Sequence, residues 1–203
     1  MGISERKERE KAEMRELILS TAAEIFLDNG FEKTSIRNIA EAIEYSPATI
    51  YLYFKDKNDL FFALSEEGFR RFFEHLKRIP QDVPPIEKLR HLGSLYLEFA
   101  LNNPAYYDLM FILRAPMATE ENEVSWNLGK KNHEVLTNLV DECLAHGHFK
   151  GQNPDQVAFM LWSFVHGLVS FRIRDRMKMY DPTKHDEITN GAFDMFQGML
   201  RNA

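Results

Sequence analysis

The stretch SIRNIAEAIEYSPATIYLYF, residues 35–54, decides how this chain folds. It contains two short helical patterns joined by a turn of three or four residues. Ser35 can cap the first helix, and Ser46 followed by Pro47 can open the second, because a proline at the first helical position loses no hydrogen bond. Apolar side chains on the two helices can pack across the bend: Ile39, Ala40 and Ile50. The pattern is typical of a helix-turn-helix, whose second helix enters the DNA major groove by its N-terminal half.

Outward from this stretch, apolar residues recur at helical spacing along almost the whole chain. Asn29-Gly30 predicts the end of the first helix, since glycine accepts the left-handed cap conformation. No alternating strand pattern of useful length occurs. We therefore expect an all-α protein of about nine helices. Besides the two short helices, the expected ranges are 9–29, 59–79, 86–102, 104–114, 121–147, 154–176 and 185–201.

Length and composition set the class of protein. The chain has 203 residues, 44% of them apolar and 28% charged, which is enough to bury a core without disulfides. Cys143 is the only cysteine, so an internal disulfide and a cysteine-based zinc site are excluded. The sequence shows neither a run of about 18 apolar residues nor a signal peptide at its charged start. We expect a cytoplasmic protein with no membrane segment.

The sequence offers little for catalysis. None of the seven histidines follows an Asp or Glu by three residues, as a di-iron helical bundle would require. The metalloprotease, dinucleotide and phosphate-loop motifs are absent from the sequence. We therefore predict no enzyme activity, no catalytic residues, no cofactor and no metal site.

Matches to one known family run in register from residue 18 to residue 60. The matching segments are 18–26, 30–31, 34–36, 39–40, 46, 49–51, 53–54, 57 and 60. Over these residues the chain resembles the TetR family of bacterial transcriptional regulators. One departure is Glu44, where the family has glycine in the turn. A residue other than glycine in a left-handed conformation costs about 1–2 kcal/mol, so the turn is expected to be slightly reshaped.

The resemblance implies two domains, a three-helix DNA-binding domain over 12–72 and a helical ligand-binding and dimerisation domain over 80–203. It also implies which residues contact DNA. Base edges would face Ser46, Pro47, Ala48 and Thr49, with Tyr45 as a further contact. Phosphates would meet a helix N-terminus, two tyrosine hydroxyls and three cations: Thr34, Ser35, Arg37, Tyr51, Tyr53, Lys55 and Lys57.

The net charge is negative, which is unexpected for a protein that resembles DNA-binding regulators. The net charge is −6, and residues 1–60 hold nine Lys and Arg against twelve Asp and Glu, a net of −3. Residues 46–54 carry no charge, so strong non-specific attraction from the second helix is not expected. Arg6, Lys7, Arg9 and Lys11 could reach phosphates as a mobile arm. Because glutamates alternate with them, the alternative is a solvated extension of the first helix.

The segment WSFVHGL, residues 162–168, resembles a Trp-x-x-x-His-Gly signature found in some TetR C-terminal domains. Trp162 and His166 lie four residues apart and share a helix face. They could form the wall of a ligand pocket, or they could be core residues in contact. Aromatic and Met side chains suit an adaptable apolar cavity. The candidate ligand-binding residues are Phe99, Tyr107, Met110, Phe111, Trp126, Trp162 and His166.

The last two helices are apolar on more than one face, which favours a subunit interface. Two such helices from each chain would form a four-helix bundle and a homodimer. The resulting interpretation is a repressor on double-stranded DNA, bound at a palindromic operator and released by an unknown small apolar or aromatic effector. The alternative is a helical adaptor or ligand-binding protein that has lost sequence-specific DNA binding.

Overall fold

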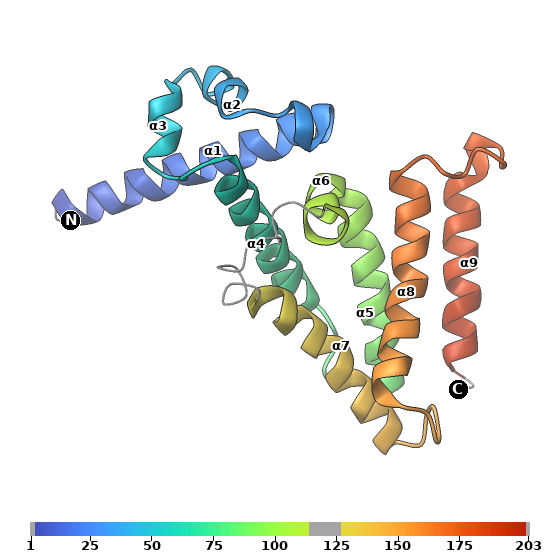
Figure 1. The fold of residues 1–203 in the computed structure, drawn as a ribbon. Helices are drawn as coiled ribbons and strands as arrows, with labels where there is room; N and C mark the ends of the chain where they lie inside the picture. The colour runs from blue at the N-terminus through green and yellow to red at the C-terminus, as the bar shows by residue number, and fades with distance from the viewer. Residues whose placement is uncertain (1–2, 114–126, 202–203) are drawn as a thin grey trace. The chain divides into compact units, whose positions relative to one another are not determined.

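The computed structural model describes residues 3–113 and 127–201. Within these ranges all regular structure is helical, which confirms the all-α prediction (Figure 1). Gly30 kinks the first helix with φ of 76°, so the break predicted at Asn29-Gly30 is confirmed. The first four elements are α1 (Ile3–Lys33), α2 (Ile36–Ala42), α3 (Pro47–Tyr51) and α4 (Lys57–Leu76).

The later elements follow the predicted order, and proline lies at the start of several of them. The helix expected over 104–114 is divided, because α6 changes into the short π-helix η1 after one turn. The beginning of the helix expected over 121–147 lies outside the described residues. The elements are α5 (Pro85–Asn102), α6 (Pro104–Tyr107), η1 (Asp108–Ile112), α7 (Asn127–Ala145), α8 (Pro154–Ile173), the 3-10 helix η4 (Pro182–Lys184) and α9 (His185–Leu200).

The described residues form two compact units. The N-terminal unit holds residues 3–68 and 104–113, and the C-terminal unit holds 69–103 and 127–201. The N-terminal unit includes α6 and η1, which pack with the N-terminal helices, and the two domains expected over 12–72 and 80–203 stay a prediction. Helical periodicity identifies such a segment as a helix but does not identify the unit against which it packs.

The N-terminal unit has a continuous apolar core. Ile39, Ala40 and Ile50 have no exposed surface, so the predicted packing of α2 against α3 is confirmed. Gly68 of α4 lies against η1, where a Cβ atom would stand 2.8 Å from Sδ of the buried Met110. A larger residue at position 68 would therefore require the Met110 side chain to shift.

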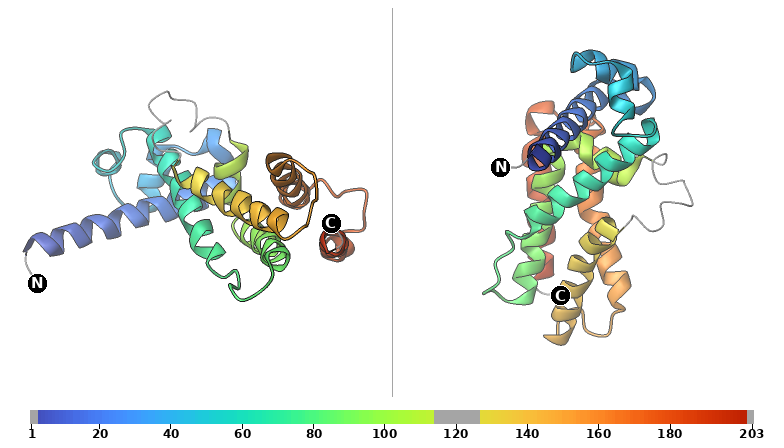
Figure 2. Two further views of the ribbon diagram at one scale, coloured as in Figure 1. Left: turned by 90° about the horizontal axis from the view of Figure 1, so that it is seen from below. Right: turned by 90° about the vertical axis from the view of Figure 1, so that its left-hand side faces the viewer.

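The C-terminal unit is a packed group of helices in which α5 contacts α7, α8 and α9 (Figure 2). Gln197 of α9 joins α5 through reciprocal hydrogen bonds: its Nε2 donates to the Arg90 carbonyl at 2.9 Å, and the Arg90 Nε donates to its Oε1 at 3.0 Å. The side chain of Cys143 is buried in α7.

α8 is unusually apolar. By length and composition alone it could cross a membrane, with a mean hydropathy of 1.3 over its most apolar window. One helix of this kind is weak evidence for a membrane segment, so the expectation of none stays a prediction. Core helices of soluble proteins also meet this criterion, and α8 packs against α5, α7 and α9 within its unit.

Candidate functional site

The helix-turn-helix is fixed by two serine caps. Ser35 Oγ accepts a hydrogen bond from the Asn38 N–H at 3.1 Å and caps α2. Ser46 Oγ accepts from the Thr49 N–H at 3.3 Å and caps α3. Each cap satisfies a backbone donor that the first helical turn leaves unpaired. Both caps were predicted from the sequence, and both are confirmed.

The turn between α2 and α3 contains a residue in a strained conformation. Glu44 has φ of 60°, in the left-handed region that favours glycine. The turn is nevertheless closed by backbone hydrogen bonds, from the Tyr45 N–H to the Ala40 carbonyl at 2.9 Å and from the Glu44 N–H to the Glu41 carbonyl at 3.2 Å. The turn therefore keeps the geometry expected for glycine at position 44.

α3 turns one face inward and exposes the other. Ile50 is fully buried, whereas Pro47 and Ala48 are exposed and Thr49 is half-buried. Tyr45, Tyr51 and Leu52 are also exposed, with Leu52 at 79%. The residues expected to contact bases thus lie on an accessible, uncharged surface. The structure brings them together on one helix and the turn that precedes it.

Two of the predicted phosphate contacts are accessible cations. Arg37 on α2 is 81% exposed, and its Nε lies 3.0 Å from Oε1 of Glu41. An ion pair this exposed is weak, so the guanidinium can exchange its partner for a phosphate. Lys55 has an exposed side chain, and its backbone N–H donates to Asp59 Oδ2 at 2.8 Å. Tyr53 is half-buried beside it.

Thr34 and Lys57 are held by contacts inside the N-terminal unit. Thr34 is 1% exposed, and its hydroxyl donates to the Gly30 carbonyl at 2.8 Å, so it supports the kink in α1. The Lys57 ammonium donates to the Phe31 carbonyl and lies 4.0 Å from the centroid of the Phe31 ring. Burial lowers the pKa of this ammonium, and Glu32 partly opposes the effect. Each side chain already has a partner inside the unit, and its contact with phosphate stays a prediction.

The predicted ligand-binding residues are divided between the two units. Phe99, Trp162 and His166 belong to the C-terminal unit, whereas Tyr107, Met110 and Phe111 belong to the N-terminal unit. Trp126 lies outside the described residues. Tyr107 and Met110 are almost fully buried. The cavity they were expected to share remains a prediction.

An aromatic and histidine cluster surrounds His166. Its ring lies 5.9 Å from that of Trp162, which in turn lies 6.1 Å from that of His133. Its Nδ1 shares a hydrogen bond with the Tyr96 hydroxyl at 3.0 Å. Burial lowers the pKa of His166, and Arg174 lowers it further. A neutral imidazole inside the unit is thus held by a phenol, an arrangement that fits either a core contact or one polar group in an apolar cavity.

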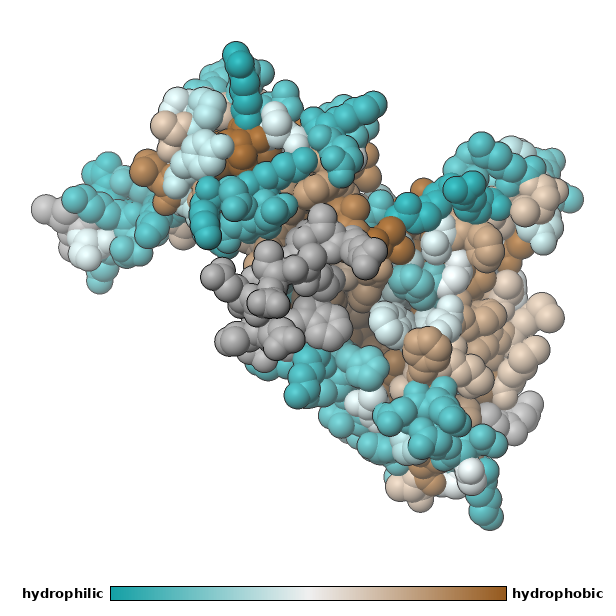
Figure 3. Space-filling model, viewed as in Figure 1, coloured by the Kyte–Doolittle hydropathy of each residue, from teal (hydrophilic) through white to brown (hydrophobic). Residues whose placement is uncertain are grey.

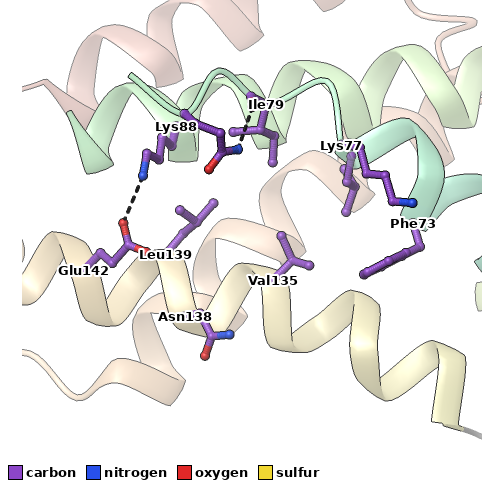
Figure 4. A pocket seen from close by; sticks show the side chains of 10 residues that line it. Phe73, Lys77, Ile79, Lys88, Val135, Asn138, Leu139 and Glu142 are labelled. Carbon is purple, nitrogen blue, oxygen red and sulfur yellow. Dashed lines mark hydrogen bonds and ion pairs between the residues drawn. The ribbon is translucent and has the colours of Figure 1, made fainter. Parts of the chain in front are cut away.

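The structure also shows a groove that sequence reasoning missed (Figure 4). It lies between the C-terminal end of α4, the start of α5 and α7, and has a volume of about 260 Å³. Lys88 reaches across it to Glu142, with the Nζ–Oε2 distance at 3.5 Å. Its lining is Phe73, Leu76, Lys77, Ile79, Gln81, Lys88, Val135, Asn138, Leu139 and Glu142. The signal in the sequence is a pair of lysines, Lys77 and Lys88, on either side of residues 80–85.

The described residues contain no group of three or more His, Cys, Asp or Glu side chains arranged to hold a metal ion. The buried Cys143 thiol has its pKa raised to about 11 by burial, with Glu142 adding to the effect. The thiol is therefore protonated at neutral pH, and a protonated thiol is a poor nucleophile.

Residues 18–64 match the family model of bacterial regulatory proteins of the tetR family. Residues 89–196, more than half of the chain, match the tetracyclin repressor-like C-terminal domain. The chain belongs to the TetR family. It is a DNA-binding transcriptional regulator, and α2 and α3 lie within the residues that match the N-terminal family model. The finer resemblance of residues 162–168 to a Trp-x-x-x-His-Gly signature stays a prediction.

Curated relatives of this TetR protein are themselves regulators. The Fatty acid metabolism regulator protein of Bacillus subtilis is 26% identical over 139 residues, covering 66% of this chain and 68% of that protein. The HTH-type transcriptional regulator HbdR of Aromatoleum is 26% identical over 160 residues, covering 76% of this chain and 68% of that protein.

Solved structures show the same fold. The regulator FadR of Bacillus subtilis, solved in complex with stearoyl-CoA, superimposes with a TM-score of 0.71 at 22% identity, covering 88% of this chain and 95% of that one. A tetR-family regulatory protein from Rhodococcus gives a TM-score of 0.72 at 18% identity, covering 92% and 96%. At these identities the likeness concerns the fold alone.

Proposed function

We propose that this TetR-family protein is a homodimeric repressor that leaves a palindromic operator when a small apolar ligand binds. The observation that carries the proposal is the exposed face of α3. Ser46 caps this helix, and Ile50 on its opposite face is fully buried. In a helix-turn-helix the exposed face meets base edges in the major groove. α3 has no Arg or Lys, so base reading rests on hydroxyls, on methyl contacts with thymine and on DNA shape.

The proposed dimer uses α8 and α9. Large apolar side chains are exposed along both helices, and Figure 3 shows apolar surface gathered over them. The rings of Phe164 and Phe196 stack at 4.0 Å and hold the two helices together within the unit. Exposed apolar area of this kind is typical of a subunit interface. The exposed members are Phe159, Met160, Phe171, Met195 and Met199.

The proposed effector carries a long apolar chain, and an acyl-CoA thioester is the first class to test. Support comes from the relatives, one named for fatty acid metabolism and another solved with stearoyl-CoA. The candidate residues in the C-terminal unit are apolar or aromatic, with His166 as one polar group. An effector must bind one conformation better than the other to change DNA affinity. α4, which contributes residues to both units, would carry the change, and a typical coupling of about 1–3 kcal/mol lowers DNA affinity 5- to 150-fold.

The proposed location is the cytoplasm, because a bacterial transcriptional regulator acts where the chromosome lies. The relatives named above are regulators of this kind.

Light scattering of the purified chain at micromolar concentration tests the oligomeric state. We expect a dimer, with Met195→Glu giving a monomer because it places a carboxylate in the apolar surface. A wild-type monomer would contradict the proposed assembly.

The function is tested by selecting DNA from a random duplex library with the purified chain. We expect a palindrome with half-sites separated by one or more helical turns. Ala48→Asp is the matched control, since position 48 is exposed and a carboxylate there repels DNA without disturbing the fold. Wild-type protein that enriches no sequence would favour the adaptor alternative.

The effector is tested by adding stearoyl-CoA to the complex with the selected palindrome. We expect release of DNA, with Trp162→Ala reducing the response while ligand-free binding stays near normal. If Trp162→Ala abolishes DNA binding without ligand, Trp162 supports the fold and the assignment of this residue to a ligand site is wrong. If stearoyl-CoA, free stearate and coenzyme A all leave the complex intact, the effector belongs to another class.

A further inference from the structure

The N-terminal part of α1 extends beyond the helices on which the rest of α1 packs (Figures 1 and 2). Every residue from 4 to 13 is exposed, yet the segment is helical throughout. A helix that is polar all round is stabilised by pairs of side chains along its own surface. Two such pairs are present: Arg6 Nε lies 2.7 Å from Glu10 Oε1, and Arg9 Nε lies 3.6 Å from Glu13 Oε1.

These pairs leave a different set of cations on another side of the helix. Lys7, Lys11 and Arg15 follow one another at intervals of four residues. They therefore form a stripe along one side of the helix, with one cation for every rise of about 6 Å along its axis. Among the described residues, no ion pair joins Lys7 or Lys11 to a carboxylate. The carboxylates of the segment fall on the opposite side of the helix or border the stripe: Glu5, Glu13 and Glu16 opposite, Glu8 and Glu10 at its edges.

The stripe continues the buried side of α1. Ile18 and Ala22 follow Arg15 at spacings of three and four residues, and both are fully buried in the core of the N-terminal unit. The guanidinium carbon of Arg15 lies 5.1 Å from the centroid of the Phe54 ring, just beyond the end of α3. One side of α1 is therefore apolar where it packs and basic where it passes the end of α3.

We propose that Lys7 and Lys11 contact DNA phosphates flanking the bases that α3 reads. The inference rests on the proposed function, because it needs DNA on the exposed face of α3. It explains how an uncharged recognition helix can work in a protein of net charge −6, since phosphate contacts supply most of the sequence-independent affinity. The contact is made by a rigid helical extension, whose residues are already ordered before DNA binds.

The test compares two double variants that remove the same charge. Lys7→Ala with Lys11→Ala removes the stripe, and Arg6→Ala with Arg9→Ala removes two cations from the ion-paired side. Alanine has the highest helix propensity, which compensates in part for the two ion pairs that the arginine variant loses. Circular dichroism checks that both variants keep the wild-type helix content. Binding to a random-sequence duplex is measured between about 50 and 200 mM salt.

We expect the lysine variant to reduce the salt slope by about two per bound chain and the arginine variant by clearly less. Equal slopes for both variants would mean that only net charge matters, and an unchanged slope for the lysine variant would mean that the stripe does not touch DNA. Either result overturns the inference.

Duplex length provides a second readout. On the palindrome recovered by selection, trimming the flanking base pairs should lower wild-type affinity and leave the lysine variant unaffected. If no duplex binds the wild-type chain at all, the proposed function itself fails. If the wild type binds and trimming lowers the affinities of both proteins equally, only the arm contact fails.

Discussion

The ammonium group of Lys57 lies 4.0 Å from the centroid of the Phe31 ring and donates a hydrogen bond to the Phe31 carbonyl. These contacts tie the start of α4 to the end of α1, 26 residues earlier in the chain. A cation held between a carbonyl and an aromatic face stabilises the folded N-terminal unit.

Lys57→Ala should therefore lower the thermal stability of the protein and leave the salt slope of DNA binding almost unchanged. Lys55→Ala is the matched control two positions away, because its side chain is exposed. That variant should keep its stability and reduce the salt slope by about one ion. Thermal melts and salt titrations of both proteins measure the two effects. The reverse result would mean that Lys57 holds a phosphate and Lys55 does not.

Thr49→Ala should change which bases are preferred more than it changes the salt slope. The Thr49 hydroxyl lies 3.1 Å from Ser46 Oγ on the exposed part of α3, and the variant removes this hydroxyl together with a methyl group. Loss of one base contact costs about 1–3 kcal/mol and relaxes specificity at one position of the half-site. Repeating the DNA selection with the variant measures this change. Arg37→Ala is the control. This variant should keep the base preference of the wild type, while the salt slope of its DNA binding falls.

Gly68→Ala should destabilise the N-terminal unit by about 1–3 kcal/mol, a typical cost of overpacking. The added Cβ would stand 2.8 Å from Met110 Sδ, and Met110 is 1% exposed, so the thioether has little room to move. Chemical denaturation of the single variants and of Gly68→Ala with Met110→Ala forms a double-mutant cycle. We expect the double variant to be destabilised by less than the sum of the two single variants, because shortening Met110 removes the shortest of the contacts and leaves Tyr106 Cδ1 at 3.0 Å. Additive costs would show that the strain lies elsewhere.

Stability should fall as the pH is lowered through the range in which free histidine gains a proton. Burial holds the pKa of His166 below its ordinary value of 6.5, and burial does the same for His75. The unfolded chain therefore binds protons more readily than the folded one. The contribution of the two neutral histidines to the free energy of unfolding is complete above about pH 6.5 and is lost as the pH falls below it. Denaturation from pH 7.5 down to about 5.5 measures the effect.

His166→Gln should flatten part of this pH dependence, and the remainder should belong to His75. Tyr96→Phe, which removes only the phenol partner of His166, is the control that keeps the imidazole. A pH profile identical in His166→Gln and the wild-type chain would show that His166 does not titrate in this range.

Local sequence patterns predicted the parts of the fold that local chemistry determines. The caps at Ser35 and Ser46, the break at Gly30 and the exposed face of α3 each depend on a few neighbouring residues, and each was found as expected. At Glu44 a slightly reshaped turn was expected, whereas the residue adopts the left-handed conformation that favours glycine.

Contacts between distant parts of the chain could not be predicted in this way. The residue types of Thr34 and Lys57 suit a phosphate, but their partners at Gly30 and Phe31 were not visible in a pattern of types. The packing of α6 and η1 with the N-terminal unit includes a close approach at Gly68. Nothing in the sequence distinguishes this glycine from the other nine. The groove beside Lys88 likewise needs three helices in place.

The absence of charge from α3 has a consequence for how fast the protein finds its operator. A repressor scans the chromosome while held loosely by phosphates, and that hold is electrostatic. Here the cations that can hold DNA lie beside the recognition helix, on α2, after α3 and on the extension of α1. Scanning can then proceed with α3 free to test each sequence, so residence on random DNA should be brief. Single-molecule tracking on stretched DNA should show short slides interrupted by frequent hops, and slides that shorten further as salt is added.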